Sequence, residues 1–217
     1  MLVSTQKNLE NGSTKKPTNK PMKRLSIYLF LILFTLPTPS QADDIRDFQI
    51  EGVSIGDSLL DYYSKEDIEK SKQDTQYPGS NKYYIITLGD TKLGGLKTLE
   101  TYERLNVSIN KDFIIHNIQV GLFFIDNFKD CKKMQKEIDK ELSIIFSNLE
   151  RDQYQKKHNY DKTGKSTSNV ISYKFKNDDT IILNCVDWST DIKLHDLLSV
   201  SAKTDIFNTW LGTEAYK

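Results

Sequence analysis

The chain has 217 residues with 30 basic and 30 acidic side chains, so its formal net charge is zero. It contains two cysteines and three histidines, and these do not recur at the spacing of metal ligands. The composition therefore argues against a metal site, and we expect no cofactor.

The first 42 residues have the three parts of a secretory signal peptide. Lys20, Lys23 and Arg24 form a basic region, and an uncharged apolar run follows from Leu25 to Leu36. The sequence Ser40-Gln41-Ala42 then provides a small-x-small cleavage site. We expect residues 1–42 to be a targeting segment and residues 43–217 to be a single exported domain, periplasmic or secreted.

Met22 is the expected true start, because a signal peptide typically begins with a methionine followed by basic residues. The apolar run is too short to span a bilayer comfortably, so we expect no permanent membrane anchor. The alternative is that this run forms a buried helix of a cytosolic protein. Without residues 1–42 the chain has 24 basic and 29 acidic side chains, a net charge of −5 that argues against a nucleic-acid partner.

Two short helices are expected near the start of the exported domain. Asp57 is placed to cap a helix that carries Leu59, Leu60 and Tyr63 on one side. Ser64, with an acidic residue three positions later, resembles a capping box that opens a second helix.

Three strands should follow. Residues 83–88 are rich in aromatic and β-branched side chains, and residues 101–109 alternate between apolar and polar. A turn at residues 110–112 leads into a long strand over residues 113–125, whose even positions are apolar. Its odd positions include Asn117, Gln119 and Gly121. One face of this strand should therefore lie in the core, while the other is only partly covered.

The strongest periodic segment runs from Asn127 to Leu149. Apolar residues recur there every three or four positions and share one helical face: Phe128, Cys131, Met134, Ile138, Leu142, Ile145 and Leu149. We expect a long amphipathic helix that packs against a sheet and carries Cys131 on its buried side.

Residues 150–169 are polar and are expected to form a long connection, either a mobile flap or a poorly ordered insert. Three more strands are expected over residues 170–176, 180–188 and 197–203, followed by a short helix over 204–211. Short connections make each set of three strands an antiparallel meander. The predicted fold is α+β: an antiparallel sheet of two three-stranded meanders packed against the long amphipathic helix, with short N-terminal helices.

The two cysteines, Cys131 and Cys185, are expected to pair. Cys185 lies in an apolar strand-like run, and two cysteines of an exported protein most often form a disulfide. Such a bond would fix the long helix to the sheet. The alternative is two free buried thiols.

No histidine has a marked catalytic partner in the sequence. His116 lies on the apolar side of its strand. This favours a structural histidine, hydrogen bonded in the core or at its edge, over a general base. His158 falls in the polar connection. His195 is next to Asp196, but adjacent residues of a strand face opposite ways, so these two do not form a dyad. We therefore name no catalytic residue.

The run from Ile50 to Tyr63, Ile-Glu-Gly-Val-Ser-Ile-Gly-Asp-Ser-Leu-Leu-Asp-Tyr-Tyr, resembles a signature of a small uncharacterised family of secreted bacterial proteins. The resemblance extends over most of the exported domain and implies no activity or functional residue. Two short helices followed by a meander also resemble, more distantly, the outer-membrane assembly lipoproteins and β-lactamase-inhibitor-like domains. The lipid-attachment cysteine of those lipoproteins has no counterpart after Ala42.

Two functions fit these features. The first is a non-enzymatic binding or protein-interaction module, whose partner would be an envelope protein or a small ligand. The partly polar strand face at Asn117, Gln119 and Gly121 motivates it. The second is a hydrolase-type enzyme in which His116 or His195 meets a carboxylate only in the folded chain.

Overall fold

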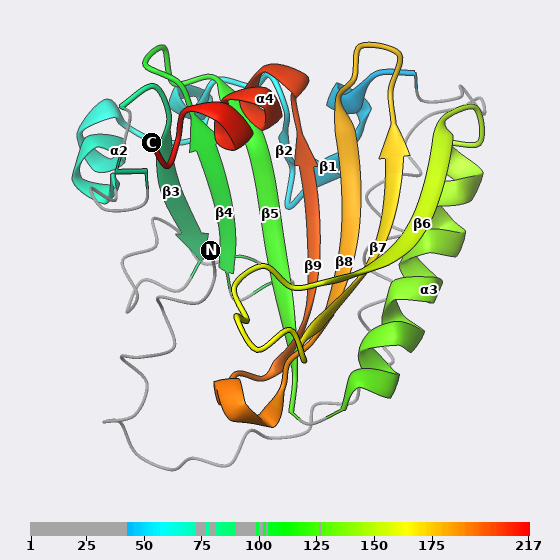
Figure 1. Cartoon of the computed structure of the whole chain (residues 1–217). Coiled ribbons are helices and arrows are strands. Elements are labelled where there is room, and N and C mark those ends of the chain that lie inside the picture. Colours follow the sequence, from blue (N-terminus) through cyan, green and yellow to red (C-terminus); the bar gives the residue numbers. More distant parts are fainter. Residues whose placement is uncertain are drawn as a thin grey trace.

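The computed structural model describes residues 43–72, 77–78, 81–89, 99, 102, 104–125 and 127–217. The expected targeting segment, residues 1–42, lies outside this part of the chain. Figure 1 shows a large twisted sheet accompanied by helices. The chain is therefore a mixed α+β protein with a large antiparallel sheet, as the sequence predicts.

The sheet has seven strands in the order β3-β4-β5-β9-β8-β7-β6, and every neighbouring pair is antiparallel. The first meander consists of β3 (Tyr84–Gly89), β4 (Arg104–Ile109) and β5 (Ile115–Phe124). The second consists of β6 (Glu150–Lys157), β7 (Thr167–Lys174), β8 (Thr180–Asp187) and β9 (Asp196–Lys203). Because β5 pairs with β9, the last strands of the two meanders join them into one continuous sheet.

In the described part of the chain, three α-helices accompany the sheet: α2 (Lys65–Ser71), α3 (Phe128–Ile145) and α4 (Asp205–Thr213). Each begins after a side chain that accepts a hydrogen bond from the main-chain amide three residues later. These capping residues are Ser64, Asn127 and Thr204. The cap at Ser64 is the one that the sequence predicts. None of the helices in the described residues is long and apolar enough to span a bilayer.

One face of the sheet packs against α3 and is apolar. Alternate residues of a strand point to opposite faces, and residues paired across antiparallel strands share a face. The buried residues of this face include Leu105, Val107, Ile118, Val120, Ile171, Ile181, Leu183, Leu198 and Val200. The N-terminal segment, with β1 (Gln49–Ile50) and β2 (Val53–Ser54), contributes to the same core. We call this side of the sheet the helix face.

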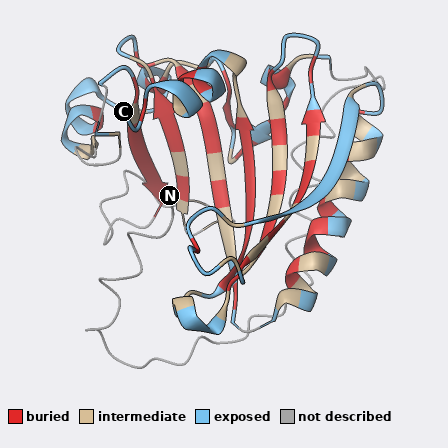
Figure 2. Cartoon of the chain, in the orientation of Figure 1, coloured by how far each residue is buried: buried red, intermediate tan, exposed pale blue. Residues whose placement is uncertain are grey.

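The opposite face carries α4 near one end of the sheet. The rings of Phe207 and Trp210 lie 5.1 and 4.8 Å from the ring of Tyr83, just before β3. These residues form a second, smaller apolar cluster. In Figure 2, strands β4, β5 and β8 alternate between buried and intermediate residues, so the face that carries α4 is only partly covered.

Two expectations about local structure are wrong. Residues 150–169 are not a long connection, because β6 takes up most of the first half and β7 begins at Thr167. The second meander therefore has four strands rather than three. All residues of β6 are exposed, as Figure 2 shows, so this edge strand has no apolar alternation by which to recognise it.

The second wrong expectation concerns the first short helix. It is a single 3-10 turn, Leu59–Asp61, and Ser58 rather than Asp57 caps it. The Asp57 carboxylate instead accepts a hydrogen bond from the main-chain amide of Ser54 at 2.9 Å.

Candidate functional site

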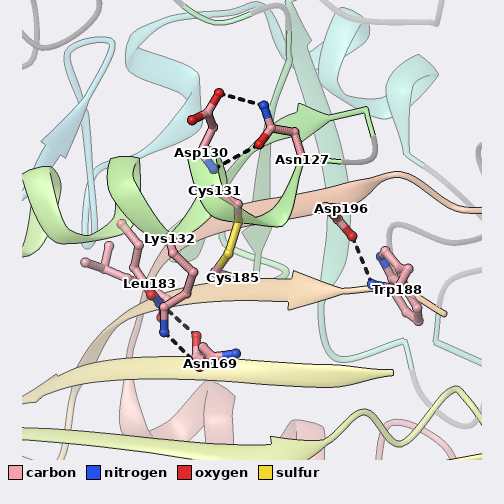
Figure 3. Close-up of a disulfide and its surroundings, with 10 residues drawn as sticks. Asn127, Asp130, Cys131, Lys132, Asn169, Leu183, Cys185, Trp188 and Asp196 are labelled. Carbon is pink, nitrogen blue, oxygen red and sulfur yellow. Dashed lines mark hydrogen bonds between the residues drawn. A yellow bond between two sulfur atoms is a disulfide. The ribbon is translucent and has the colours of Figure 1, made fainter. Parts of the chain in front are cut away.

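Cys131 of α3 and Cys185 of β8 are brought to disulfide-bonding distance on the helix face (Figure 3). Their Cα atoms are 6.1 Å apart, and neither residue is exposed to solvent. The pair lies inside the main core, where no substrate reaches it. Its place in the fold therefore fits a structural role.

Polar contacts around this pair also fix α3 to the sheet. The buried Gln135 amide donates to the main-chain carbonyls of Asn169 at 2.7 Å and Leu183 at 3.1 Å. Lys132 donates to the side-chain carbonyl of Asn169 at 2.8 Å, as Figure 3 shows. One turn of α3 thus bonds to two strands, while Nδ2 of Asn169 makes no hydrogen bond to the described residues.

A second polar link joins α3 to β6 and β7. Arg151 makes two hydrogen bonds of 2.8 Å to the Asp139 carboxylate, which also accepts the Tyr173 hydroxyl at 2.6 Å. Burial alone would raise the pKa of the Asp139 carboxyl, but the hydrogen bonds from Arg151 and Tyr173 outweigh burial and lower it. This cluster anchors the exposed edge strand.

His116, a histidine considered for catalysis, contacts α4. Its Nδ1 lies 3.1 Å from Oγ1 of Thr204, the residue that caps α4, and its ring packs against Tyr83. Burial lowers the pKa of His116, with Asp179 raising it and Lys82 lowering it to smaller extents. The neutral imidazole of His116 is bonded to the residue that caps α4, so it helps to position that helix.

The other two histidines occupy different environments. His195 is exposed, and its neighbour Asp196 is buried and accepts the main-chain amide of Trp188 at 3.0 Å. His158 lies beyond the end of β6, with its ring 4.3 Å from that of Trp188. Among the described residues, no hydrogen bond joins His116, His158 or His195 to a carboxylate, so a His–carboxylate dyad is not assembled in this part of the chain.

The face opposite α3 carries hydroxyl and amide side chains on neighbouring strands, together with the apolar side chains of Ile85, Val170, Ile182, Val186 and Leu197. The cross-strand register places them in rows, such as Asn117 of β5 beside Lys203 of β9 and then Thr180 of β8. We define the polar face by residues Thr87, Arg104, Asn106, Ser108, Asn117, Gln119, Ser168, Thr180, Asn184, Ser199, Ser201 and Lys203. These residues come from six of the seven strands.

Part of the polar face is held by hydrogen bonds between side chains. Thr87 and Asn106 are 3.0 Å apart, and the Asn117 amide donates to Ser108 at 3.2 Å. Gln119 donates to Ser199 at 2.9 Å. These bonds connect β3 to β4, β4 to β5 and β5 to β9, which makes this half of the face a fixed array.

The other half contains polar atoms that lack a partner. Oγ of Ser168, Oγ1 of Thr180 and Oδ1 of Asn184 are buried and make no hydrogen bond. Leaving a buried polar atom unpaired costs about 1–3 kcal/mol, so such atoms are uncommon in native proteins. The register spreads the three along the face: Thr180 pairs with Lys203, Asn184 lies four residues further along β8, and Ser168 lies opposite Val186 beyond it. Unpaired atoms at these positions fit a surface that meets a ligand or ordered water.

Lys203 brings a positive charge to the same place. Its side chain is partly buried, and no described residue forms a hydrogen bond or ion pair with it. Burial lowers the pKa of its ammonium, and repulsion by Lys156 lowers it further. Lys156 belongs to β6, whose far end and connection to β7 are drawn across the sheet in Figure 1, on the side of α4.

Aromatic side chains stand beside the polar face. Phe123 of β5 and Tyr154 of β6 are 54% and 42% exposed. The register of β5, β9, β8, β7 and β6 puts both on the side of Asn184 and Ser199. The polar face is thus bordered by exposed rings as well as by hydroxyl, amide and ammonium groups.

The sequence identifies only the β5 part of this site. Asn117 and Gln119 were recognised as polar positions of a long strand, and both lie on the polar face. Lys203, Thr180 and Asn184 were missed. The strict alternation of polar and apolar residues in β9, with Ser199, Ser201 and Lys203 on one side, is the signal that could have found them: Leu198, Val200 and Ala202 lie on the other.

Comparison with known proteins adds no relative. The chain matches no protein-family model, no curated protein and no solved structure at the level from which a relationship would be inferred. The arrangement of side chains on the polar face is therefore the basis for a functional proposal.

Proposed function

We propose that this protein is a non-enzymatic binding module that receives its ligand on the polar face of the sheet. The observation that carries the proposal is the set of unpartnered buried atoms of Ser168, Thr180 and Asn184 on one face of the sheet, with Lys203 directly opposite Thr180. A buried polar group without a partner costs stability, and a ligand that offers a hydrogen bond to it recovers that cost. The two meanders and the amphipathic helix α3 serve as the rigid scaffold that presents this face.

The proposal includes export of residues 43–217 to the periplasm or the medium. The signal-peptide pattern of residues 1–42 supports it, and so does the disulfide-distance pair of Cys131 and Cys185. The resemblance of residues 50–63 to secreted bacterial proteins points the same way. Fractionation of the producing cell, with the mass of the recovered protein, tests this part separately: a cytosolic chain that retains residues 1–42 contradicts it.

The binding function is tested by capture from an envelope extract with three forms of the tagged full chain. The wild type is compared with Asn184→Leu, which removes the unpartnered amide oxygen and keeps the branched shape of the side chain, and with Lys136→Met on the exposed side of α3. Mass spectrometry then identifies the retained proteins and small molecules. We expect a component that the wild type and Lys136→Met retain and Asn184→Leu loses.

Two results would contradict the proposal. The first is an identical set of retained components for all three forms. The second is turnover in a broad hydrolase screen that is abolished by His116→Gln, since that would favour an enzyme whose site includes the histidine near Thr204.

A further inference from the structure

The charged residues of the polar face are basic on the inner strands and include acidic residues on the edge strand β6. This distribution indicates the charge of the ligand. On the five inner strands the charged residues of this face are Arg104, Lys174 and Lys203, all of them basic. The acidic residues that share the face in register are Glu150 and Asp152, on the exposed edge strand β6. The inner part of the face is therefore positively charged, although residues 43–217 as a whole are acidic.

The three inner cations are not equivalent. Lys174 forms an exposed ion pair with Asp178 at 2.6 Å, so its charge is already balanced. Lys203 has no such partner among the described residues and lies between Asn117 and Thr180 in the cross-strand row. An ammonium group that is partly buried beside a second lysine, Lys156, is stabilised when an anion binds next to it.

We propose that the polar face binds an acidic carbohydrate, with a carboxylate or sulfate group of the sugar held by Lys203. This inference rests on the proposed binding function and specifies the chemistry of its ligand. The positive charge of Lys203 indicates that the ligand is anionic. The uncharged hydroxyl and amide side chains of the same face indicate that it is a carbohydrate.

Hydroxyl-rich ligands need both donors and acceptors at short intervals. The amide groups of Gln119 and Asn184 and the hydroxyl of Thr180 provide both kinds within adjacent rows of the sheet. The exposed rings of Phe123 and Tyr154 offer flat apolar surfaces on which the C–H face of a sugar ring can stack. By register, Tyr154 lies in the same row as Asn184 and Ser199, so a stacking surface and amide groups share this part of the face.

A nucleic acid fits this face less well. Binding of a phosphate backbone requires a row of cations that follows it, and affinity rises with each phosphate neutralised. Among the described residues, Lys203 and Arg104 are the cations of the inner face that form no ion pair, and Glu150 and Asp152 border the face on β6. An isolated acidic group on an otherwise neutral, hydroxyl-bearing ligand matches the charge better.

The test is isothermal titration calorimetry of the purified full chain with two sugar probes of equal length, trigalacturonate and maltotriose. Lys203→Met removes the charge and keeps the length of the side chain. Lys203→Arg keeps the charge, and Lys136→Met on α3 is the matched control on the other side of the molecule. Circular dichroism and the thermal midpoint of each variant show whether it is folded.

We expect the wild type, Lys203→Arg and Lys136→Met to bind trigalacturonate more tightly than maltotriose. Loss of one charge-assisted hydrogen bond should weaken trigalacturonate binding by Lys203→Met by about tenfold and leave maltotriose binding unchanged. Equal binding of both sugars, equal loss of both in Lys203→Met, or binding of a short single-stranded DNA in preference to trigalacturonate would overturn the inference. If neither sugar binds while Asn184→Leu still loses a component of the envelope extract, the carbohydrate assignment fails and the binding function stands.

Discussion

The side-chain amide of Gln119 donates a hydrogen bond of 2.9 Å to the hydroxyl of Ser199, across the junction of β5 and β9. The two residues are 80 positions apart in the chain and belong to different meanders. This bond makes the polar face continuous over the junction. A ligand on this face would therefore touch residues from both halves of the protein.

The unpaired polar atoms of the polar face should lower the free energy of unfolding of the protein without ligand. Thr180→Val replaces a buried hydroxyl that has no partner by a methyl group of similar shape. We expect this variant to be more stable than the wild type, by about 1 kcal/mol in the free energy of unfolding. Urea unfolding followed by tryptophan fluorescence measures the difference.

The matched control for that change is Thr87→Val on the same face. Thr87 is hydrogen bonded to Asn106 at 3.0 Å, so its replacement leaves the amide without this partner. We expect a loss of about 1 kcal/mol instead of a gain. If both valine variants are destabilised equally, Thr180 has a partner in solution and the argument from unpaired atoms fails.

The Cys131–Cys185 pair should contribute strongly to stability. Closing a loop across the sequence separation of 54 residues stabilises a protein by about 4 kcal/mol on the chain-entropy model, and often by less. The double variant Cys131→Ala/Cys185→Ala should therefore unfold at a lower denaturant concentration than the oxidised wild type. Adding a reductant should lower the wild type to a similar value and leave the variant unchanged.

The oxidation state of the pair is a separate measurement. Alkylation of the native protein without reductant, followed by mass spectrometry of its peptides, should show residues 131 and 185 in one cross-linked pair. Two alkylated cysteines under these conditions would mean that α3 is held by packing and by the hydrogen bonds of Lys132, Gln135 and Asp139 without a disulfide.

Stability should fall in acid in part because of Asp139. The pKa of its carboxyl is lowered in the folded protein, since the hydrogen bonds from Arg151 and Tyr173 outweigh the effect of burial. A lowered pKa gives stability that is complete above the pKa of the unfolded chain, about 4, and is lost as the pH falls through the lower folded value. Asp139→Asn should be less stable than the wild type at pH 7, and the gap should narrow between pH 5 and pH 2.

Asp152→Asn serves as the control for that titration, because Asp152 is an exposed residue on the same strand as Arg151. Its unfolding free energy should follow the wild type at every pH. A gap between wild type and Asp139→Asn that stays constant from pH 7 to pH 2 would show that the carboxylate does not act through its charge.

His116 should matter for the position of α4 and not for binding. Thr204→Ala removes both the helix cap and the partner of the imidazole, and should cost about 1 kcal/mol of stability. Thr204→Ser keeps the hydroxyl and should restore most of it. Ligand binding measured by calorimetry should be the same for the wild type and Thr204→Ser, and a loss of binding in the serine variant would place α4 within the site.

The sequence predicts the elements whose burial leaves a periodic pattern. The apolar repeat of α3 and the alternation in β5 both follow from packing on one side, and the cap at Ser64 follows from local hydrogen bonding. The strand β6 has no such pattern, because an edge strand whose residues are all exposed is defined by its hydrogen bonds to β7 alone.

The site is harder to predict for a related reason. Asn117 can be read as a polar position of a strand, but its neighbour Lys203 is 86 residues later in the chain. The row that contains them exists only through the register of β5 with β9 and of β9 with β8. Periodicity shows which residues share a face of one strand, and only the register shows which strands share that face.

The central claim is that the polar face is where this protein binds its ligand. The most direct measurement is two-dimensional NMR of the isotope-labelled full chain during titration with trigalacturonate. We predict that the side-chain amides of Asn117, Gln119 and Asn184 and the ammonium of Lys203 shift on saturation, while the side-chain amide of Gln135 on the helix face does not. Saturable shifts confined to α3 and the helix face, with the signals of the polar face unmoved, would contradict the account.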